Sequence, residues 1–138
     1  MAEIFADTNF WVALGNPKDS LYEISQYFGS DLEHLNIVTS EIVLSEILEI
    51  TSADPPHFKA QTLGFIGSLI ENRSIIIEPM SPKLFEETVQ FYRRHIDKDW
   101  GFADCSSFVI MKSRGIREAL TYDRHFIQAG FKALLRNA

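Results

Sequence analysis

The sequence lacks several features that would assign a protein to a class outright. It contains a single cysteine, Cys105, so it cannot form an internal disulfide and matches no cysteine spacing of a zinc site. No apolar run approaches the roughly 20 residues that a membrane span needs, and no signal-peptide pattern opens the chain. These absences argue against a disulfide scaffold and a helical membrane protein. We therefore expect a cytoplasmic protein in which Cys105 simply packs in the core.

The sequence also has no segment with the composition of a flexible linker. No stretch rich in Pro, Gly or Ser divides the 138 residues, so we expect a single domain over residues 1–138. Apolar residues make up 46% of the chain and charged residues 23%, which is the composition of a globular protein with a core of its own.

Basic residues are scarce in the first two-thirds of the chain. Residues 1–92 hold 4 Lys and Arg against 14 Asp and Glu, a net charge of −10, whereas residues 93–138 hold 9 against 5, a net charge of +4. The overall charge of −6 argues against nucleic acid as a partner. The separation of acidic and basic residues along the chain favours a polyanion such as nucleic acid as a partner. A bound divalent cation would also offset part of the acidic excess.

Short apolar strands alternate with helical patterns along the whole chain, which is typical of a parallel sheet covered on both faces. The predicted fold class is α/β, with three α/β/α layers and a mostly parallel sheet of four to five strands. Ser20, Ser40 and Ser81 are the expected helix N-caps. Strands are predicted at 2–6, 36–40, 73–79, 118–123 and 131–136, and helices at 8–15, 20–30, 40–53, 54–72, 81–96 and 103–115.

Two aspartates follow strands of this predicted sheet. Asp7 ends the first strand and Asp123 comes directly after the apolar part of the fourth. Ligands of parallel sheets bind beyond the carboxyl ends of the strands. Both carboxylates are therefore predicted to lie at the edge where function is expected.

Two further carboxylates interrupt the apolar faces of predicted helices. Successive helical residues are turned by about 100°, and this places Glu46 inside the apolar arc of the helix 40–53, between Ile42 and Ile50. On the helix that begins at residue 103, Asp104 shares a face with Phe108. Each carboxylate therefore points toward the expected core rather than toward a solvated face.

Each of these acids has a purely structural alternative. Asp7 and Asp104 could cap helices, Asp123 could form an Asx turn, and Glu46 could reach water or an arginine at the core edge. Together they are harder to explain, because carboxylates about 6 Å apart repel by about 3 kcal/mol per pair at an effective dielectric near 20. Protonation or a cation must relieve that repulsion. Oxygen ligands without a His or Cys cluster indicate Mg²⁺ or Mn²⁺.

Four segments together resemble the PIN-domain family, and in particular its VapC-type ribonuclease toxins: "DTN", "SEIVLSEIL", "FADCSSFVIM" and "ALTYDRHFIQAGF", in this order and spacing. The resemblance covers nearly the whole chain. It implies a parallel sheet between helices and an acidic site that binds Mg²⁺ or Mn²⁺ and cuts RNA. The acidic positions of the family fall on Asp7, Glu46, Asp104 and Asp123, and its small polar position falls on Thr8.

The sequence departs from the family pattern at two positions beside the site. Asn9 stands where Ser or Gly is common, and Ala103 stands where Thr or Ser is common. Asn9 is expected to alter a hydrogen bond next to the metal ligands. All four acids are present, so we expect an active enzyme.

The leading hypothesis is metal-dependent hydrolysis of RNA phosphodiester bonds. Asp7, Asp104 and Asp123 would hold the ion, Glu46 would bind an ion or orient the attacking water, and Thr8 would donate from its hydroxyl to a ligand or to phosphate. Basic side chains would contact the RNA, although solvated turns and helix ends explain them equally well. The predicted RNA contacts are Arg124, His125 and Arg94.

Two rivals belong to other classes. A PIN-like module could bind RNA or a protein without cutting, and a phosphoreceiver could use Asp7 as its nucleophile. The second is disfavoured because no second aspartate lies two positions on and no lysine follows a late strand in the expected place. The family resemblance also implies a homodimer and an antitoxin partner that presents a basic side chain to the acids.

Overall fold

Five parallel strands form one sheet at the centre of the computed structural model, which describes residues 2–136. The order across the sheet is β3-β2-β1-β4-β5, and every neighbouring pair is parallel. The strands are β1 Glu3–Ala6, β2 Asn36–Ser40, β3 Ile75–Glu78, β4 Glu118–Leu120 and β5 Lys132–Ala133. The predicted α/β class is therefore confirmed, at the upper end of the expected strand number.

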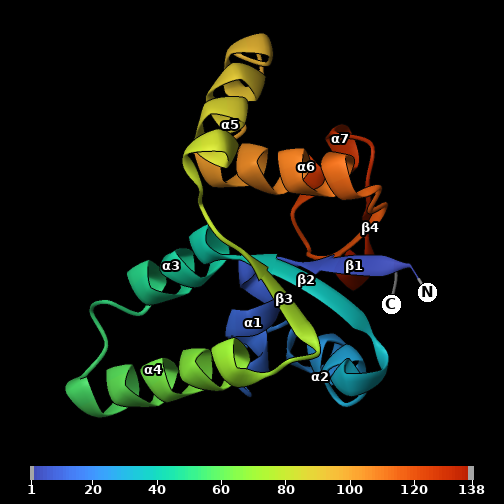
Figure 1. Cartoon of the computed structure of the whole chain (residues 1–138). Helices are drawn as coiled ribbons and strands as arrows, with labels where there is room; N and C mark the ends of the chain where they lie inside the picture. Colours follow the sequence, from blue (N-terminus) through green and yellow to red (C-terminus); the bar gives the residue numbers. More distant parts are fainter. Residues whose placement is uncertain (1, 137–138) are drawn as a thin grey trace.

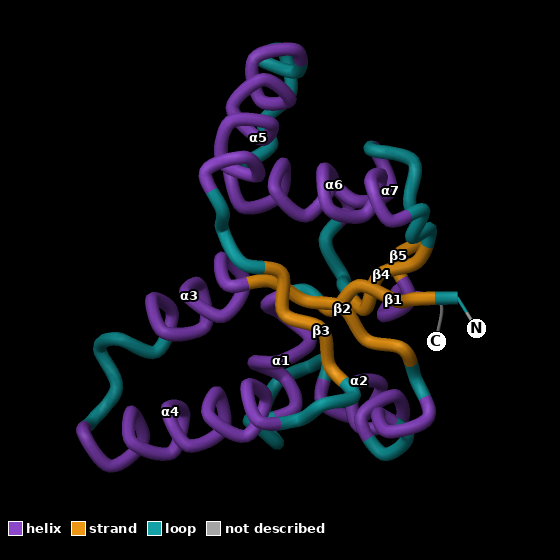
Figure 2. The backbone as a smooth tube through the Cα atoms, viewed as in Figure 1, coloured by secondary structure: helices purple, strands orange, loops and turns teal. Residues whose placement is uncertain are grey.

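Helices cover both faces of the sheet, so the predicted three layers are confirmed (Figures 1 and 2). In the view of Figure 1, α1, α2 and α4 lie below the sheet and α5, α6 and α7 lie above it, while α3 extends from one edge. The helices are α1 Thr8–Leu14, α2 Tyr22–Gly29, α3 Glu41–Ile50, α4 Pro56–Glu71, α5 Pro82–Arg94, α6 Phe102–Arg114 and α7 Arg124–Gln128.

Local capping decides where several helices begin. Ser40 accepts a hydrogen bond from the backbone N–H of Val43, and Ser81 accepts one from Leu84, so both predicted N-caps are confirmed. The Ser20 prediction is wrong, because α2 begins at Tyr22 with Leu21 at its N-cap. The side chain of Asp19 accepts from the Leu21 N–H and forms a turn where the helix was expected to start.

Two predicted helices and one predicted strand extended too far toward the C-terminus. Helix α3 ends at Ile50 rather than residue 53, and α5 ends at Arg94 rather than residue 96. The predicted strand 131–136 shrinks to two residues, because the chain turns into a 3₁₀ helix at Leu134–Arg136. Within residues 2–136, strand β5 pairs only with β4, so little holds a longer strand at that side of the sheet.

Aromatic side chains fill the core on both sides of the sheet. Phe5, Phe10 and Phe108 are fully buried, and Trp11 is almost so. The indole N–H of Trp11 donates to Thr39 Oγ1 over 3.3 Å, which fixes α1 against β2. Cys105 packs in this core as predicted, and burial raises the pKa of its thiol to about 11.

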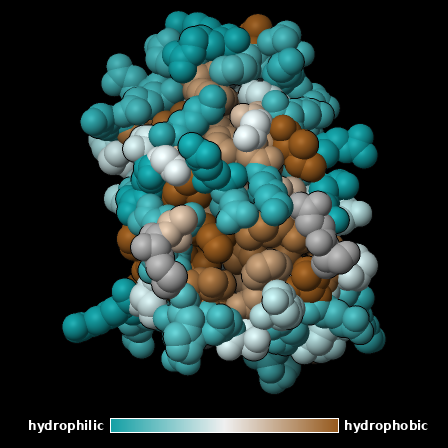
Figure 3. Space-filling model, turned by 90° about the vertical axis from the view of Figure 1, so that its right-hand side faces the viewer, coloured by the Kyte–Doolittle hydropathy of each residue, from teal (hydrophilic) through white to brown (hydrophobic). Residues whose placement is uncertain are grey.

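The apolar surface of the protein is unevenly distributed. Figure 3 shows hydrophobic side chains gathered on the face that forms the right-hand side of Figure 1, within a rim of hydrophilic ones. The apolar arc predicted for α3 is only partly buried, since Leu48 is 38% exposed and Ile50 is 61% exposed. The end of α3 extends away from the sheet (Figure 1), so these residues do not reach the core. Within residues 2–136, no helix has the length and apolarity that a membrane crossing requires.

Candidate active site

Four acidic residues converge at the carboxyl ends of the central strands. Asp7 follows β1 directly, and Asp123 lies three residues after the end of β4. Glu46 lies on α3, the helix that follows β2, and Asp104 lies in the first turn of α6. Because β1, β2 and β4 are parallel and adjacent, these elements meet at one edge of the sheet, as the sequence predicts.

Asp7 is the most buried of the four acids, with 8% of its surface exposed. It occupies the N-cap position of α1, but its side chain makes no capping hydrogen bond. Its Oδ2 atom instead accepts a 2.8 Å hydrogen bond from the hydroxyl of Thr121. The pKa of Asp7 is raised from 3.8 to about 7, chiefly by burial and to a smaller extent by the charges of Asp104 and Glu46. Asp7 therefore serves the acidic cluster rather than the helix terminus.

Asp104 and Asp123 both face the imidazole of His125. The Nδ1 atom of His125 lies 3.2 Å from Asp104 Oδ2 and 3.1 Å from Asp123 Oδ1. Burial raises the pKa of Asp104, and the nearby charge of Asp123 adds to the effect. Asp123 also accepts from the backbone N–H of His125, which confirms the turn expected there. His125 was predicted to contact RNA beside the acids, whereas the structure places its ring among them.

Thr8 and Glu46 join the cluster through a direct contact. The Thr8 hydroxyl donates a 2.7 Å hydrogen bond to Glu46 Oε1. Glu46 is half-buried, so it lies at the edge of the core, whereas the helical projection placed it inside the apolar arc. The hydrogen bond from Thr8 goes to a predicted ligand, which is one of the two roles expected of it.

A second layer of polar groups holds the acids in place, and the sequence reasoning missed its centre. The buried hydroxyl of Thr121 donates to Asp7 and accepts from the backbone N–H of Asp123 and from Asn9 Nδ2. Asn9 Oδ1 in turn accepts from the backbone N–H of Tyr122. Asn9, noted as a departure from the family pattern, thus ties α1 to the loop that carries Asp123. The available signal for Thr121 was its place at the end of a strand, two residues before an acid.

Two of the three predicted RNA contacts, Arg124 and Arg94, lie outside the acidic cluster. Arg124 is exposed, and its side chain forms no ion pair within the described residues. The guanidinium carbon of Arg94 lies 5.8 Å from the centre of the Phe91 ring, in a groove between α5 and α6. Arg94 makes no ion pair or hydrogen bond with the four acids in residues 2–136. Contact of either residue with RNA stays a prediction.

The donor set suits a hard divalent cation. Ligand atoms of Asp104, Asp123 and His125 lie within 4.8 Å of one another, and Asp7 and Glu46 are close enough to interact electrostatically. The raised pKa values of Asp7 and Asp104 mean that burial and mutual repulsion disfavour their charged forms. A cation bound among them would remove that penalty.

Comparison with known proteins gives the same fold and a related sequence. The family model described as PIN domain matches residues 4–132. The 23S rRNA-specific endonuclease VapC20 of Mycobacterium tuberculosis is 29% identical over 128 residues, which cover 93% of this chain and 95% of that protein. The crystal structure of VapC20, described as a Sarcin-Ricin loop cleaving toxin, matches with a TM-score of 0.79 at 28% identity, over 94% of this chain and 96% of that one.

A more distant structure shows the same fold alone. FitAcB from Neisseria gonorrhoeae matches with a TM-score of 0.62 at 18% identity, over 94% of both chains. The family model spans nearly all the described residues, including the elements that carry the four acids. The chain therefore belongs to the PIN-domain family.

Proposed function

We propose that this chain, taken over residues 1–138 as one PIN domain, is a metal-dependent endoribonuclease that acts as the toxin of a toxin-antitoxin pair. The observation that carries the proposal is the convergence of Asp7, Glu46, Asp104 and Asp123 at one edge of a parallel sheet, two of them with raised pKa values. The similarity to VapC20, named as a 23S rRNA-specific endonuclease, supports RNA as the substrate.

The proposed ion is Mg²⁺ or Mn²⁺. When bound, it would supply Lewis acidity to the scissile phosphate and lower the pKa of a water molecule. Asp7, Asp104 and Asp123 hold the ion through carboxylate oxygens. Glu46 contributes a further ligand or orients the attacking water, and the hydrogen bond from Thr8 fixes the carboxylate of Glu46 for that task.

Thr121 and the exposed basic residue Arg124 complete the proposed mechanism. Thr121 holds the Asp7 carboxylate through a hydrogen bond to Oδ2, which orients the carboxylate. Arg124 directly follows Asp123 and is exposed, so its guanidinium is available to an RNA phosphate. Without a cation the acids would repel the RNA backbone, because both are negatively charged. An RNA substrate also implies action in the cytoplasm.

A ribonuclease that cuts the RNA of its own cell must be held inactive, so we propose an antitoxin as its partner. An antitoxin segment would present a basic side chain to the four acids. An apolar groove of about 570 Å³ between α3, α4 and β3 offers a place for the rest of such a segment. Its apolar lining consists of Leu44, Leu48, Ile66, Ile70, Ile75 and Ile77. We also propose a homodimer, whose mass light scattering would measure.

Cleavage of RNA tests the proposal directly. Purified protein is incubated with 23S rRNA and with a mixed RNA pool, in Mn²⁺, in Mg²⁺ and in EDTA, and new 5′ ends are mapped. We expect defined cuts in the presence of the metal, none in EDTA, and at least a hundredfold slower cutting by Asp104→Asn. Asp54→Asn is the matched control, because Asp54 is exposed in the turn between α3 and α4.

Two outcomes would reject the nuclease. Equal cutting by the wild type and Asp104→Asn would indicate a contaminating enzyme. RNA binding without cleavage under any metal would favour the PIN-like binding module instead.

A further inference from the structure

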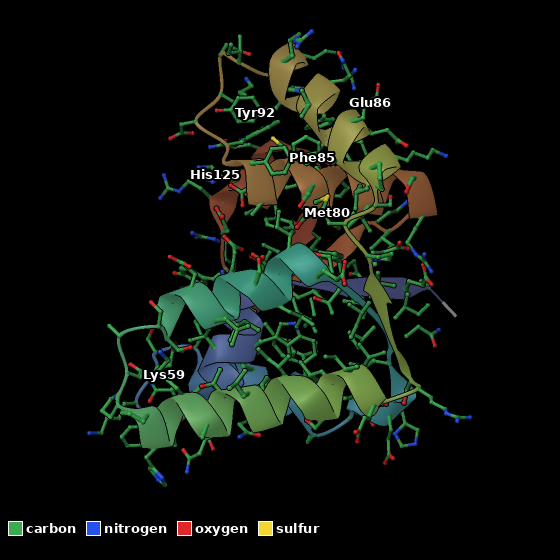
Figure 4. The ribbon with its side chains drawn as sticks, turned by 60° about the vertical axis from the view of Figure 1, so that its left-hand side comes forward. Lys59, Met80, Phe85, Glu86, Tyr92 and His125 are labelled. Carbon is green, nitrogen blue, oxygen red and sulfur yellow. The ribbon has the colours of Figure 1, made fainter. Side chains whose placement is uncertain are left out.

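Both ring nitrogens of His125 face carboxylates. Nδ1 lies 3.2 Å from Asp104 Oδ2 and 3.1 Å from Asp123 Oδ1, while Nε2 lies 3.3 Å from Asp99 Oδ1. Figure 4 shows His125, which belongs to α7, beside the beginning of α6 and on the side of the molecule that also carries Phe85 and Tyr92 of α5. Because both nitrogens are engaged, the ring is not free to contact an RNA phosphate, and a role inside the acidic cluster fits it better.

The spacing around Nδ1 resembles the edge of a coordination octahedron. Neighbouring ligand atoms of an octahedral ion with bonds near 2.1 Å lie about 3 Å apart. The two distances from Nδ1, 3.1 and 3.2 Å, have that length. The three ligand atoms also lie within 4.8 Å of one another, so one ion can contact all of them after small side-chain movements.

Asp99 provides an independent observation on the other side of the ring. Metal-binding histidines almost always donate their second ring N–H to a carboxylate, a backbone carbonyl or water, which fixes the tautomer and the ring plane. Asp99 Oδ1 stands 3.3 Å from Nε2, in the position that this arrangement requires. With the proton on Nε2, the lone pair of Nδ1 faces Asp104 and Asp123.

We propose that His125 is a nitrogen ligand of the divalent ion, bound through Nδ1 beside Asp104 and Asp123, and that Asp99 positions its ring. The inference rests on the proposed function, because it assigns a ligand to the ion of the same site. An imidazole ligand favours transition metals over Mg²⁺. The protein is therefore expected to prefer Mn²⁺ to Mg²⁺ more strongly than a site of carboxylates alone.

The alternative is a positively charged His125 that stands in place of the ion and pairs with both carboxylates. The two arrangements predict opposite effects of removing the ring. If His125 is a ligand, its loss weakens Mn²⁺ binding. If it competes with the ion, its loss strengthens Mn²⁺ binding, because a positive charge leaves the site.

The test is pulsed electron paramagnetic resonance of the Mn²⁺-loaded protein, combined with calorimetric titration of Mn²⁺ and Mg²⁺. We expect a ¹⁴N coupling in the wild type that changes to a ¹⁵N coupling after ¹⁵N-histidine labelling and disappears in His125→Gln. Mn²⁺ affinity should fall about tenfold or more in His125→Gln, and Mg²⁺ affinity less than about threefold. Asp99→Ala should keep the nitrogen coupling and lower Mn²⁺ affinity by about two- to tenfold, below the usual range for such partners because Asp99 is exposed.

His34→Gln is the matched control. His34 also pairs with an aspartate through Nδ1, at 2.7 Å from Asp31, but it precedes β2 and so lies at the opposite edge of the parallel sheet. It should retain the wild-type nitrogen coupling and metal affinities.

The outcomes separate this inference from the proposed function. One equivalent of bound Mn²⁺ without a nitrogen coupling in the wild type would overturn the His125 assignment and leave the metal site standing. Tighter Mn²⁺ binding by His125→Gln would overturn it in favour of the competing charge. No Mn²⁺ binding by the wild type would reject both the ligand and the metal-dependent nuclease.

Discussion

Replacing Asp7 by Asn should stabilise the metal-free protein at high pH. Asp7 is 8% exposed, has no lysine or arginine paired with it within residues 2–136, and accepts one hydrogen bond from Thr121. Asparagine has nearly the same shape and its oxygen can accept that hydrogen bond, but it carries no charge. The substitution therefore removes a buried charge while keeping the packing of α1.

The pKa of Asp7 sets the sign and the size of the effect. Burial raises it from 3.8 to about 7 in the folded state. Below about pH 4 the carboxyl is neutral in both states, and between pH 4 and 7 the folded state keeps a proton that the unfolded state has released. The free energy of unfolding therefore falls as the pH rises, by up to about 4 kcal/mol above pH 7. The free energy of unfolding of Asp7→Asn should not fall in this way, because asparagine does not titrate.

Urea denaturation in EDTA, followed by circular dichroism between pH 4 and 9, measures the difference. We expect Asp7→Asn to be about 2–4 kcal/mol more stable than the wild type at pH 9 and similar to it near pH 4. Asp54→Asn should follow the wild type. Added Mn²⁺ should reverse the order, because it binds and stabilises the wild type preferentially. A variant that is less stable than the wild type at pH 9 in EDTA would refute the reasoning.

Three further substitutions test separate parts of the structure. Thr121→Val should lower Mn²⁺ affinity about 10- to 100-fold in calorimetry, because Asp7 loses its hydrogen-bond donor; unchanged affinity would show that Thr121 does not orient the ligand. Arg124→Ala, made in the inactive Asp104→Asn protein, should reduce the salt dependence of RNA binding by about one ion in fluorescence anisotropy, and an unchanged slope would exclude a phosphate contact. Ser81→Ala should cost about 1 kcal/mol in urea denaturation while RNA cleavage stays at the wild-type rate, and equal stability would show that the cap contributes nothing.

Local signals explain why most of the fold was predictable. Ser40 and Ser81 cap helices through hydrogen bonds to residues three positions on, so the sequence contains both partners. Gly115 ends α6 with a φ of 70°, a conformation that glycine adopts without strain. The prediction of Ser20 as an N-cap failed because Asp19, one residue earlier, competes for the same backbone groups and forms a turn. Two adjacent capping residues leave the choice open in the sequence.

Predictions failed where packing at a distance decides the outcome. Leu48 and Ile50 continue the apolar pattern of α3, yet both are exposed because the end of the helix extends past the sheet. Strand β5 has only two residues because the chain then turns into the 3₁₀ helix Leu134–Arg136. The spacing of apolar residues predicts neither the exposure of the end of α3 nor the length of β5.

Some features of the acidic site could likewise be predicted from the sequence, whereas others required the structure. Asp7 and Asp123 could be predicted because parallel strands bring their carboxyl ends together. The contact between His125 and Asp104 joins α7 to α6 across 21 residues, and the hydrogen bond of Thr121 to Asp7 spans 114. Sequence spacing carries no information about where an imidazole ring or a hydroxyl points once helices have packed, so both contacts needed the structure.

The most direct test of the acidic site is the position of Mn²⁺ in crystals of the protein, located by anomalous diffraction. The proposed metal centre predicts an anomalous peak within bonding distance of carboxylate oxygens from Asp7, Asp104 and Asp123. Crystals grown in saturating Mn²⁺ that show no peak there, or a peak only at other surface carboxylates, would contradict a metal centre built from these residues.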